Sequence, residues 1–175
     1  MEIKKIITGT LDENCYVLKE DNMCLVIDPG DDADLIKKEI GNDKILAILL
    51  THSHFDHIGA LREIIGKKNI PILKDRILEE KEYKYGPFVF STIKTKGHSN
   101  DSITYYFKSG NAMFTGDFLF KGSIGRCDLP SGSIIDMEKS IEKIKTYDEF
   151  ITLYPGHGDI TTLEEEKKNN PYLNK

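Results

Sequence analysis

An unbroken apolar run at residues 45–50 most constrains the fold, and it leads directly into Thr51-His52-Ser53-His54-Phe55-Asp56-His57. A run without polar alternation is typical of a strand that is buried on both faces of a layered α/β protein. A helical pattern follows at residues 58–65. The chain therefore delivers three histidines and one aspartate to the end of a buried strand, just before a helix.

Neutral imidazole and carboxylate groups are ligands of Zn²⁺ and similar metal ions. The motif offers four such groups within six residues, more than one tetrahedral ion needs from so short a segment. We therefore expect two metal ions, each bound by part of the motif. A polar loop with chance histidines is the alternative, and the position at the end of a buried strand argues against it.

Short apolar runs alternate with amphipathic segments along the rest of the chain. We expect strands at residues 3–8, 15–18, 23–27, 45–50, 70–73, 88–95, 102–108, 112–115 and 150–153. We expect helices at residues 34–40, 58–65 and 134–144 and after Thr161, and the charged segment 74–85 is also interpreted as helical. Strands with interspersed helices predict a layered sandwich of α and β elements.

Length and composition narrow the class of protein. A chain of 175 residues without a linker suits one domain, residues 1–175. A net charge of −5 and the absence of a long basic run argue against nucleic acid as a partner. No apolar run approaches the length of a membrane span or of a secretory signal core. Three cysteines without CxxC spacing fit a reducing compartment, so we expect a cytoplasmic protein.

Three more ligand-type side chains directly follow predicted strands. His98 follows the strand at residues 88–95, Asp117 the strand at 112–115, and His157 the strand at 150–153. A glycine stands beside each of them, and glycine lets backbone segments approach closely. Each of the three could be an ordinary turn residue. The same placement in separate segments indicates loops that converge on one metal centre.

The order of these motifs resembles that of the metallo-β-lactamase superfamily: HxHxDH, Gly-His after a strand, Thr-Gly-Asp, and Pro-Gly-His-Gly near the end. The similarity runs from residues 14–18 and 28–30 to residues 170–173. Residues 116–120 and 122–128 look most like the short bacterial glyoxalase II-like hydrolases. The resemblance implies an α/β (α+β) protein with an αββα four-layer sandwich, and metals at the edge where strand ends meet.

Carried over position by position, the resemblance implies a binuclear centre. One metal would be held by His52, His54 and His98, a second by Asp56, His57 and His157, and Asp117 would bridge the two. Among these ligands, Asp56 and Asp117 are the expected catalytic carboxylates. The expected cofactors are two zinc ions, with iron or manganese as alternatives, because the ligand set also suits those metals.

The implied activity is hydrolysis of a small-molecule thioester similar to S-lactoylglutathione, by a hydroxide between the two metals. The alternatives are an iron-dependent persulfide dioxygenase, another hydrolase of the superfamily such as a lactonase or nuclease, and a binding module without catalysis. Glutathione-specific relatives carry a further helical region beyond the last motif, which is not seen in these 175 residues. The thiol of the substrate therefore stays open, as does the oligomeric state.

Residues near the proposed ligands allow further expectations. Arg126 either anchors a substrate carboxylate or pairs with Asp128 or a loop carbonyl. Cys127 is not expected to bind metal, because Asp117 fills the equivalent role.

Two departures from the family pattern lie beside His98. Lys96 stands where relatives often have proline, and Asn100-Asp101 stand where Pro-Gly is common. We expect both departures to reshape the loop at His98 without touching a proposed ligand.

Overall fold

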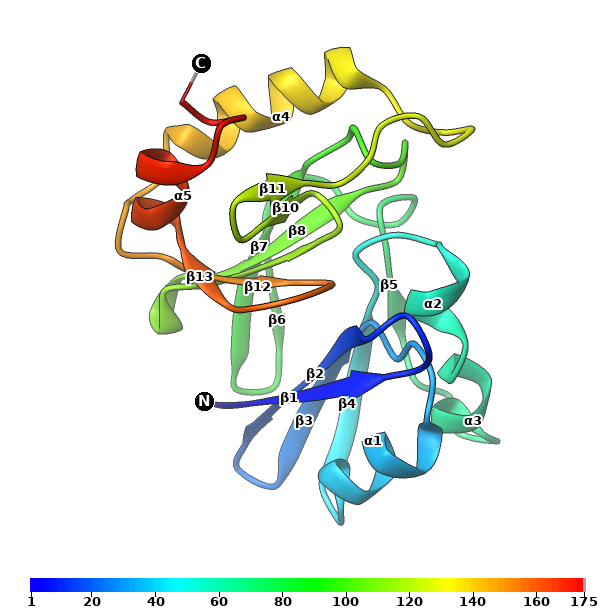
Figure 1. The fold of residues 1–175 in the computed structure, drawn as a ribbon. Helices are drawn as coiled ribbons and strands as arrows, with labels where there is room; N and C mark the ends of the chain where they lie inside the picture. The colour runs from blue at the N-terminus through cyan, green and yellow to red at the C-terminus, as the bar shows by residue number, and fades with distance from the viewer. Residues whose placement is uncertain (175) are drawn as a thin grey trace.

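Two β-sheets face each other, and each is covered by helices on its outer side (Figure 1). The structure is a computed structural model that describes residues 1–174. The first sheet has the strand order β1-β2-β3-β4-β5 and the second β13-β12-β9-β8-β7-β6. The helices α1 to α3 cover the first sheet, and α4 and α5 cover the second (Figure 1). This is the αββα four-layer sandwich that the family resemblance implied.

The N-terminal part of the chain builds the first sheet. Its strands are β1 (Glu2–Thr8), β2 (Glu13–Glu20), β3 (Met23–Ile27), β4 (Lys44–Leu49) and β5 (Ile72–Leu73). The pairs β1–β2 and β2–β3 are antiparallel, whereas β3–β4 and β4–β5 are parallel. Its helices are α1 (Ala33–Ile40), α2 (Phe55–Ile58) and α3 (Leu61–Ile65).

The C-terminal part builds the second sheet. Its strands are β6 (Glu82–Tyr85), β7 (Phe88–Lys94), β8 (Ile103–Phe107), β9 (Ala112–Gly116), β12 (Thr152–Pro155) and β13 (Thr161–Thr162). A 3₁₀ turn, η1 (Lys108–Gly110), precedes β9, and β10 (Leu119–Phe120) and β11 (Ser123–Ile124) form a separate ribbon. The helices are α4 (Ile134–Lys145) and α5 (Leu163–Asn169). The pair β9–β12 is parallel, so both strands end at the same edge.

Alternating side chains divide the apolar residues into layers. On β2, Tyr16 and Leu18 point into the core between the sheets, while Cys15 and Val17 lie in the layer under the helices. This period of two is what a strand covered on both faces requires. Cys15 and Cys24 are fully buried free thiols in the same outer layer.

One expected helix is wrong, and another is divided in two. Part of residues 74–85 is the strand β6, because Tyr83 and Tyr85 alternate with charged residues and both stack on Phe90 of β7. The expected helix at 58–65 is split into α2 and α3. A Cβ at Gly59 would lie 2.3 Å from the carbonyl oxygen of Gly30, so the chain passes close to that loop between the two helices.

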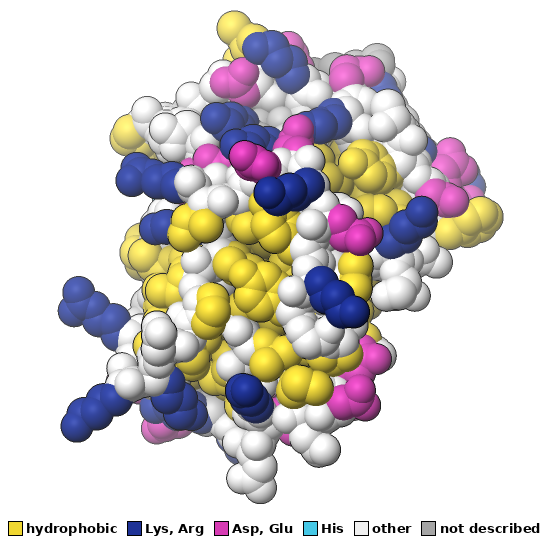
Figure 2. Space-filling view, turned by 180° about the vertical axis from the view of Figure 1, so that it is seen from behind, with side chains coloured by type: hydrophobic (Ala, Val, Ile, Leu, Met, Phe, Trp, Pro, Cys, Tyr) yellow, Lys and Arg dark blue, Asp and Glu magenta, His cyan; other side chains and the backbone are white. Residues whose placement is uncertain are grey.

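Figure 2 shows the face of the molecule opposite to the one drawn in Figure 1. Apolar side chains gather in the middle of that face, with lysines and carboxylates around them, and no histidine is seen there (Figure 2). Among residues 1–174, no helix combines the length and apolar character needed to span a membrane.

Candidate metal centre

Seven side chains that follow strand ends lie together at one edge of the two sheets. Four come from the segment after β4, and one each from the segments after β7, β9 and β12. They are His52, His54, Asp56, His57, His98, Asp117 and His157. These are the residues that the sequence analysis assigned to metal ions. Six of them form two groups of three, and Asp117 lies against both groups. A third group of possible metal ligands joins His52 and His57 to Asp28.

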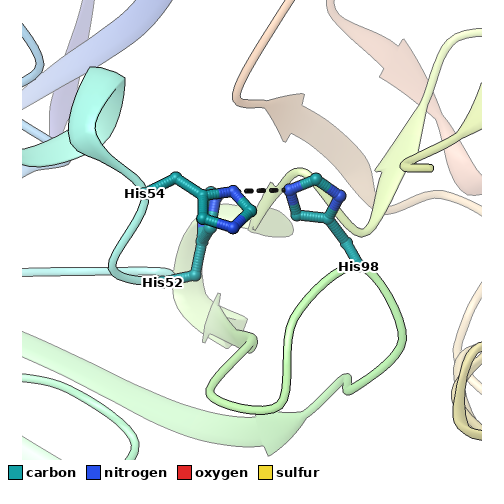
Figure 3. Close-up of side chains that lie close together, drawn as sticks. All are labelled: His52, His54 and His98. Carbon is teal, nitrogen blue, oxygen red and sulfur yellow. Dashed lines mark hydrogen bonds between the residues drawn. The ribbon is translucent and has the colours of Figure 1, made fainter. Parts of the chain in front are cut away.

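The first group, which we call the first trio, is His52, His54 and His98 (Figure 3). His54 Nδ1 lies 2.9 Å from His98 Nε2 and 3.1 Å from His52 Nε2. One ring nitrogen of each residue therefore faces a common point. Burial lowers the pKa of both His52 and His54, which favours the neutral, metal-binding form of these rings.

In the first trio, the ring nitrogens of His52 and His98 that face away from the common point make hydrogen bonds. These bonds show which nitrogen of each ring keeps its lone pair for a metal ion. His98 Nδ1 lies 2.9 Å from the carbonyl oxygen of Arg126. A carbonyl only accepts, so Nδ1 carries the proton and Nε2 keeps its lone pair. The Thr51 hydroxyl donates to Asp28 at 2.5 Å and can therefore accept from His52 Nδ1 at 3.1 Å. Both contacts aim Nε2 inward, as the outer hydrogen-bond partners of metal-binding histidines do.

The second trio is Asp56, His57 and His157. His157 Nε2 lies 3.2 Å and His57 Nε2 3.8 Å from Asp56 Oδ2. His157 Nδ1 donates to the carbonyl oxygen of Leu11 at 3.0 Å, which leaves Nε2 facing the trio. The Asp56 carboxylate raises the pKa of His157, and His157 in turn lowers the pKa of Asp56.

Asp117 lies between the two trios. Its Oδ1 is 3.3 Å from His57 Nε2, and its Oδ2 is 3.5 Å from His98 Nε2 and 3.6 Å from His157 Nε2. Burial raises the pKa of Asp117, but the surrounding histidines outweigh burial, so the pKa lies below its usual range. Asp117 is thus an anion in reach of both trios.

Two buried polar atoms that make no hydrogen bond test whether metal ions fit this centre. His57 Nε2 and Asp117 Oδ1 are buried without a hydrogen bond among the described residues. Such atoms destabilise a fold unless a ligand satisfies them. A Cβ at Gly156 would lie 2.4 Å from Asp117 Oδ1 and 2.7 Å from His57 Cε1, so glycine is needed here. Nitrogen-rich donors with a shared carboxylate suit two divalent transition-metal ions.

Asp28 is a functional residue that the sequence analysis missed. It follows β3 and accepts hydrogen bonds from Thr51 N at 2.7 Å and Thr51 Oγ1 at 2.5 Å. It also lies 3.0 Å from His57 Nδ1, so both of its oxygens are engaged and it orients His57 rather than facing the centre. Burial lowers the pKa of His57, but Asp117 and Asp28 outweigh burial and raise it. Its position directly after a buried strand was the available signal.

Glu13 is a second residue that was missed. It is 1% exposed, and burial raises the pKa of its carboxyl to about 9. Thr8 Oγ1 donates to its Oε2 at 2.7 Å, and its Oε1 lies 3.7 Å from His57 Nδ1. A Cβ at Gly30 would lie 2.4 Å from Oε2, so the close packing there depends on glycine. Its place at the start of a strand gave no sequence signal.

Arg126 contributes to the centre through its backbone. Its side chain forms two 2.7 Å hydrogen bonds to Asp128, while its carbonyl accepts from His98. Of the two roles expected for the Arg126 side chain, the structure shows the pairing with Asp128. Anchoring of a substrate carboxylate stays a prediction. Cys127 Sγ lies 3.4 Å from the carbonyl oxygen of Gly125 and, within residues 1–174, belongs to no metal-ligand cluster.

Known sequences and structures show the family. A sequence model described as "Metallo-beta-lactamase superfamily" matches residues 8–87 and 76–157. The "Probable metallo-hydrolase YqgX" of Bacillus subtilis is 35% identical, with 99% of this chain and 98% of that protein covered. The "Hydroxyacylglutathione hydrolase GloC" of Haemophilus influenzae is 30% identical, with 99% of each covered.

Three solved structures have the same fold. The BLEG-1 B3 metallo-beta-lactamase has a TM-score of 0.92 at 33% identity, with 99% of this chain and 100% of that one covered. TTHA1623 in a di-iron-bound form has a TM-score of 0.86 at 30% identity, covering 97% and 100%. ETHE1 from Myxococcus xanthus has a TM-score of 0.84 at 26% identity, covering 100% and 86%. The chain therefore belongs to the metallo-β-lactamase superfamily, as its motifs predicted.

Proposed function

We propose that this protein is a dinuclear zinc hydrolase that cleaves small-molecule thioesters. The observation that carries the proposal is the convergence of two trios on Asp117, a carboxylate within 3.6 Å of both. When bound, two such ions lower the pKa of coordinated water to about 7 and polarise a substrate carbonyl. The similarity to GloC supports a thioester as the substrate.

The chain's own residues would position these ions and the water. His52, His54 and His98 would hold one ion and Asp56, His57 and His157 the other, with Asp117 shared. His157 lowers the pKa of Asp56, and the histidines lower that of Asp117, so both carboxylates stay anionic. We assign to them the orientation of the attacking water.

A side-chain nucleophile is not required. Cys127 is near the centre, but burial raises the pKa of its thiol, which keeps it protonated. Ser53 and Ser99 lie beside the ligands, and both donate to Asp101 rather than to a base at the centre. We further propose that the protein works in the cytoplasm, where its three free cysteines stay reduced.

A persulfide dioxygenase with a single iron is the second candidate, and the structural similarity to ETHE1 favours it. The complete second trio favours the dinuclear hydrolase, because a single iron leaves that donor set unused.

Paired assays on zinc-loaded and iron-loaded protein distinguish the two candidate activities. One assay follows hydrolysis of S-lactoylglutathione and a panel of other thioesters, and the other follows oxygen consumption with glutathione persulfide. We expect thioester hydrolysis by the zinc form without oxygen uptake. Oxygen uptake by the iron form without hydrolysis in either form would reject the hydrolase.

A further inference from the structure

We propose that Asp101 is a positioning residue that sets the distance between the two loops of the first trio. The inference rests on the proposed function, because it gives the first trio a metal ion to hold. Two of its imidazoles come from the loop after β4, and the third comes from the loop after β7. Something must fix these loops relative to each other if three nitrogens are to face one point (Figure 3).

One carboxylate contacts both loops beside the ligands. Ser53, which stands between His52 and His54, donates to Asp101 Oδ2 at 2.5 Å. Ser99, which follows His98, donates to Asp101 Oδ1 at 2.8 Å. Each oxygen of Asp101 thus holds the immediate neighbour of a ligand. Hydrogen bonds to an ionised carboxylate are stronger than those between neutral groups.

The His98 side of this bridge is firmly anchored. Ser99 is 1% and Ser102 3% exposed, and their hydroxyls lie 2.7 Å apart. Because Ser99 donates to Asp101, it accepts from Ser102. A backbone hydrogen bond from Ile103 N to Thr51 O, 2.9 Å long, joins the same two loops nearby. Asp101 therefore joins this buried pair of serines to the exposed Ser53.

His54 is the ligand that most needs such support. The outer nitrogens of His52 and His98 have protein partners, whereas the hydrogen bonds within residues 1–174 include none from His54 Nε2. The orientation of His54 then depends on its backbone, which Ser53 fixes through Asp101. Ligand geometry must hold within about 0.5 Å for a productive site.

The test measures zinc affinity of metal-free protein with a competing chelator. We expect Asp101→Ala to lower the affinity for one of the two zinc ions by about 10- to 100-fold and to change the affinity for the other by less than about threefold. Ser53→Ala should weaken the same ion, and adding it to Asp101→Ala should cost little more, because both remove one hydrogen bond. Asp101→Asn keeps one acceptor oxygen and should lie between. Asp34→Ala is the control, since this exposed carboxylate of α1 contacts Lys37.

Cobalt substitution gives a readout that a general loss of stability would not move. The absorption bands of Co²⁺ at the first trio should shift in Asp101→Ala, while the melting temperature of the metal-free protein stays near that of the wild type. Two unchanged zinc affinities, or equal weakening of both ions, would overturn the role of Asp101 even if the wild type binds two ions. A wild type that binds no zinc would reject the proposed function, and the role of Asp101 with it.

Discussion

The two trios are built from different chemistry. The first consists only of imidazoles, and its outer contacts are a hydroxyl and a backbone carbonyl. The second contains a carboxylate, and its His57 is backed by Asp28, with Glu13 also close. Both trios draw on two segments of the chain: the first joins the segment after β4 to the loop after β7, and the second joins α2 to the loop after β12.

This difference indicates that one edge of the fold provides a neutral and an anionic donor set side by side. Ligand charge and rigidity both tune metal affinity. We therefore expect the second trio to hold its ion mainly through charge and the first through the placement of three neutral imidazoles, with Asp117 as the link between them. The variants below test this division, beginning with the residue that belongs to both trios.

Replacing Asp117 should have the largest effect. Asp117→Ala removes the carboxylate shared by both trios, so metal content should fall and hydrolysis should drop by on the order of 1,000-fold or more. Elemental analysis and thioester assays on the same preparation measure both. Asp148→Ala, at an exposed carboxylate away from the centre, serves as the control. Full activity in metal-free Asp117→Ala would refute the dinuclear mechanism.

His54→Ala should show whether the two trios bind their metal ions independently. It removes one of three imidazoles from the first trio and leaves the donors of the second in place. We expect one bound zinc instead of two, and hydrolysis lower by on the order of 100-fold. Metal stoichiometry is the decisive measurement. Loss of both ions would show that the trios do not bind independently.

Asp28→Asn should act chiefly on the second trio. The amide replaces the carboxylate that lies 3.0 Å from His57 Nδ1, so His57 is oriented less firmly. Changes to such outer partners cost about 10- to 100-fold in metal affinity. Competitive titration should show the larger loss of affinity at the second trio. The cobalt spectrum of the first trio should shift less, because Asp28 reaches His52 only through Thr51. The reverse pattern would contradict the division between the trios.

Arg126→Ala should have the smallest effect. The centre uses the carbonyl of this residue, which the substitution keeps, and the side chain is occupied by Asp128. We expect unchanged metal content and a change in KM below about threefold. A KM that rises for acidic thioesters alone would instead establish substrate anchoring.

The sequence predicted the converging side chains of the candidate centre better than the residues that support them. His98, Asp117 and His157 each follow an apolar run, so the ends of strands that later prove to be neighbours could be recognised in advance. Asp28 also follows such a run, but its role depends on the parallel pairing of β3 with β4, which places it beside Thr51. Strand order was not available from local patterns.

Two further features that the local sequence did not reveal also have physical causes. The segment containing Tyr83 and Tyr85 is rich in charge and was interpreted as a helix, whereas stacking on Phe90 makes it a strand. The role of Asp101 depends on two serines in different loops, at residues 53 and 99, that become neighbours only in the folded chain. Long-range packing overrides local propensity in the first case and creates the contact in the second.

The spread of the ligands along the chain has a consequence for synthesis. The first trio is complete once residue 98 has been made, whereas the second lacks a ligand until residue 157, close to the end of the 175-residue chain. All three donors of the first trio are therefore synthesised well before the last donor of the second. Asp117, which lies against both trios, is made between these two points.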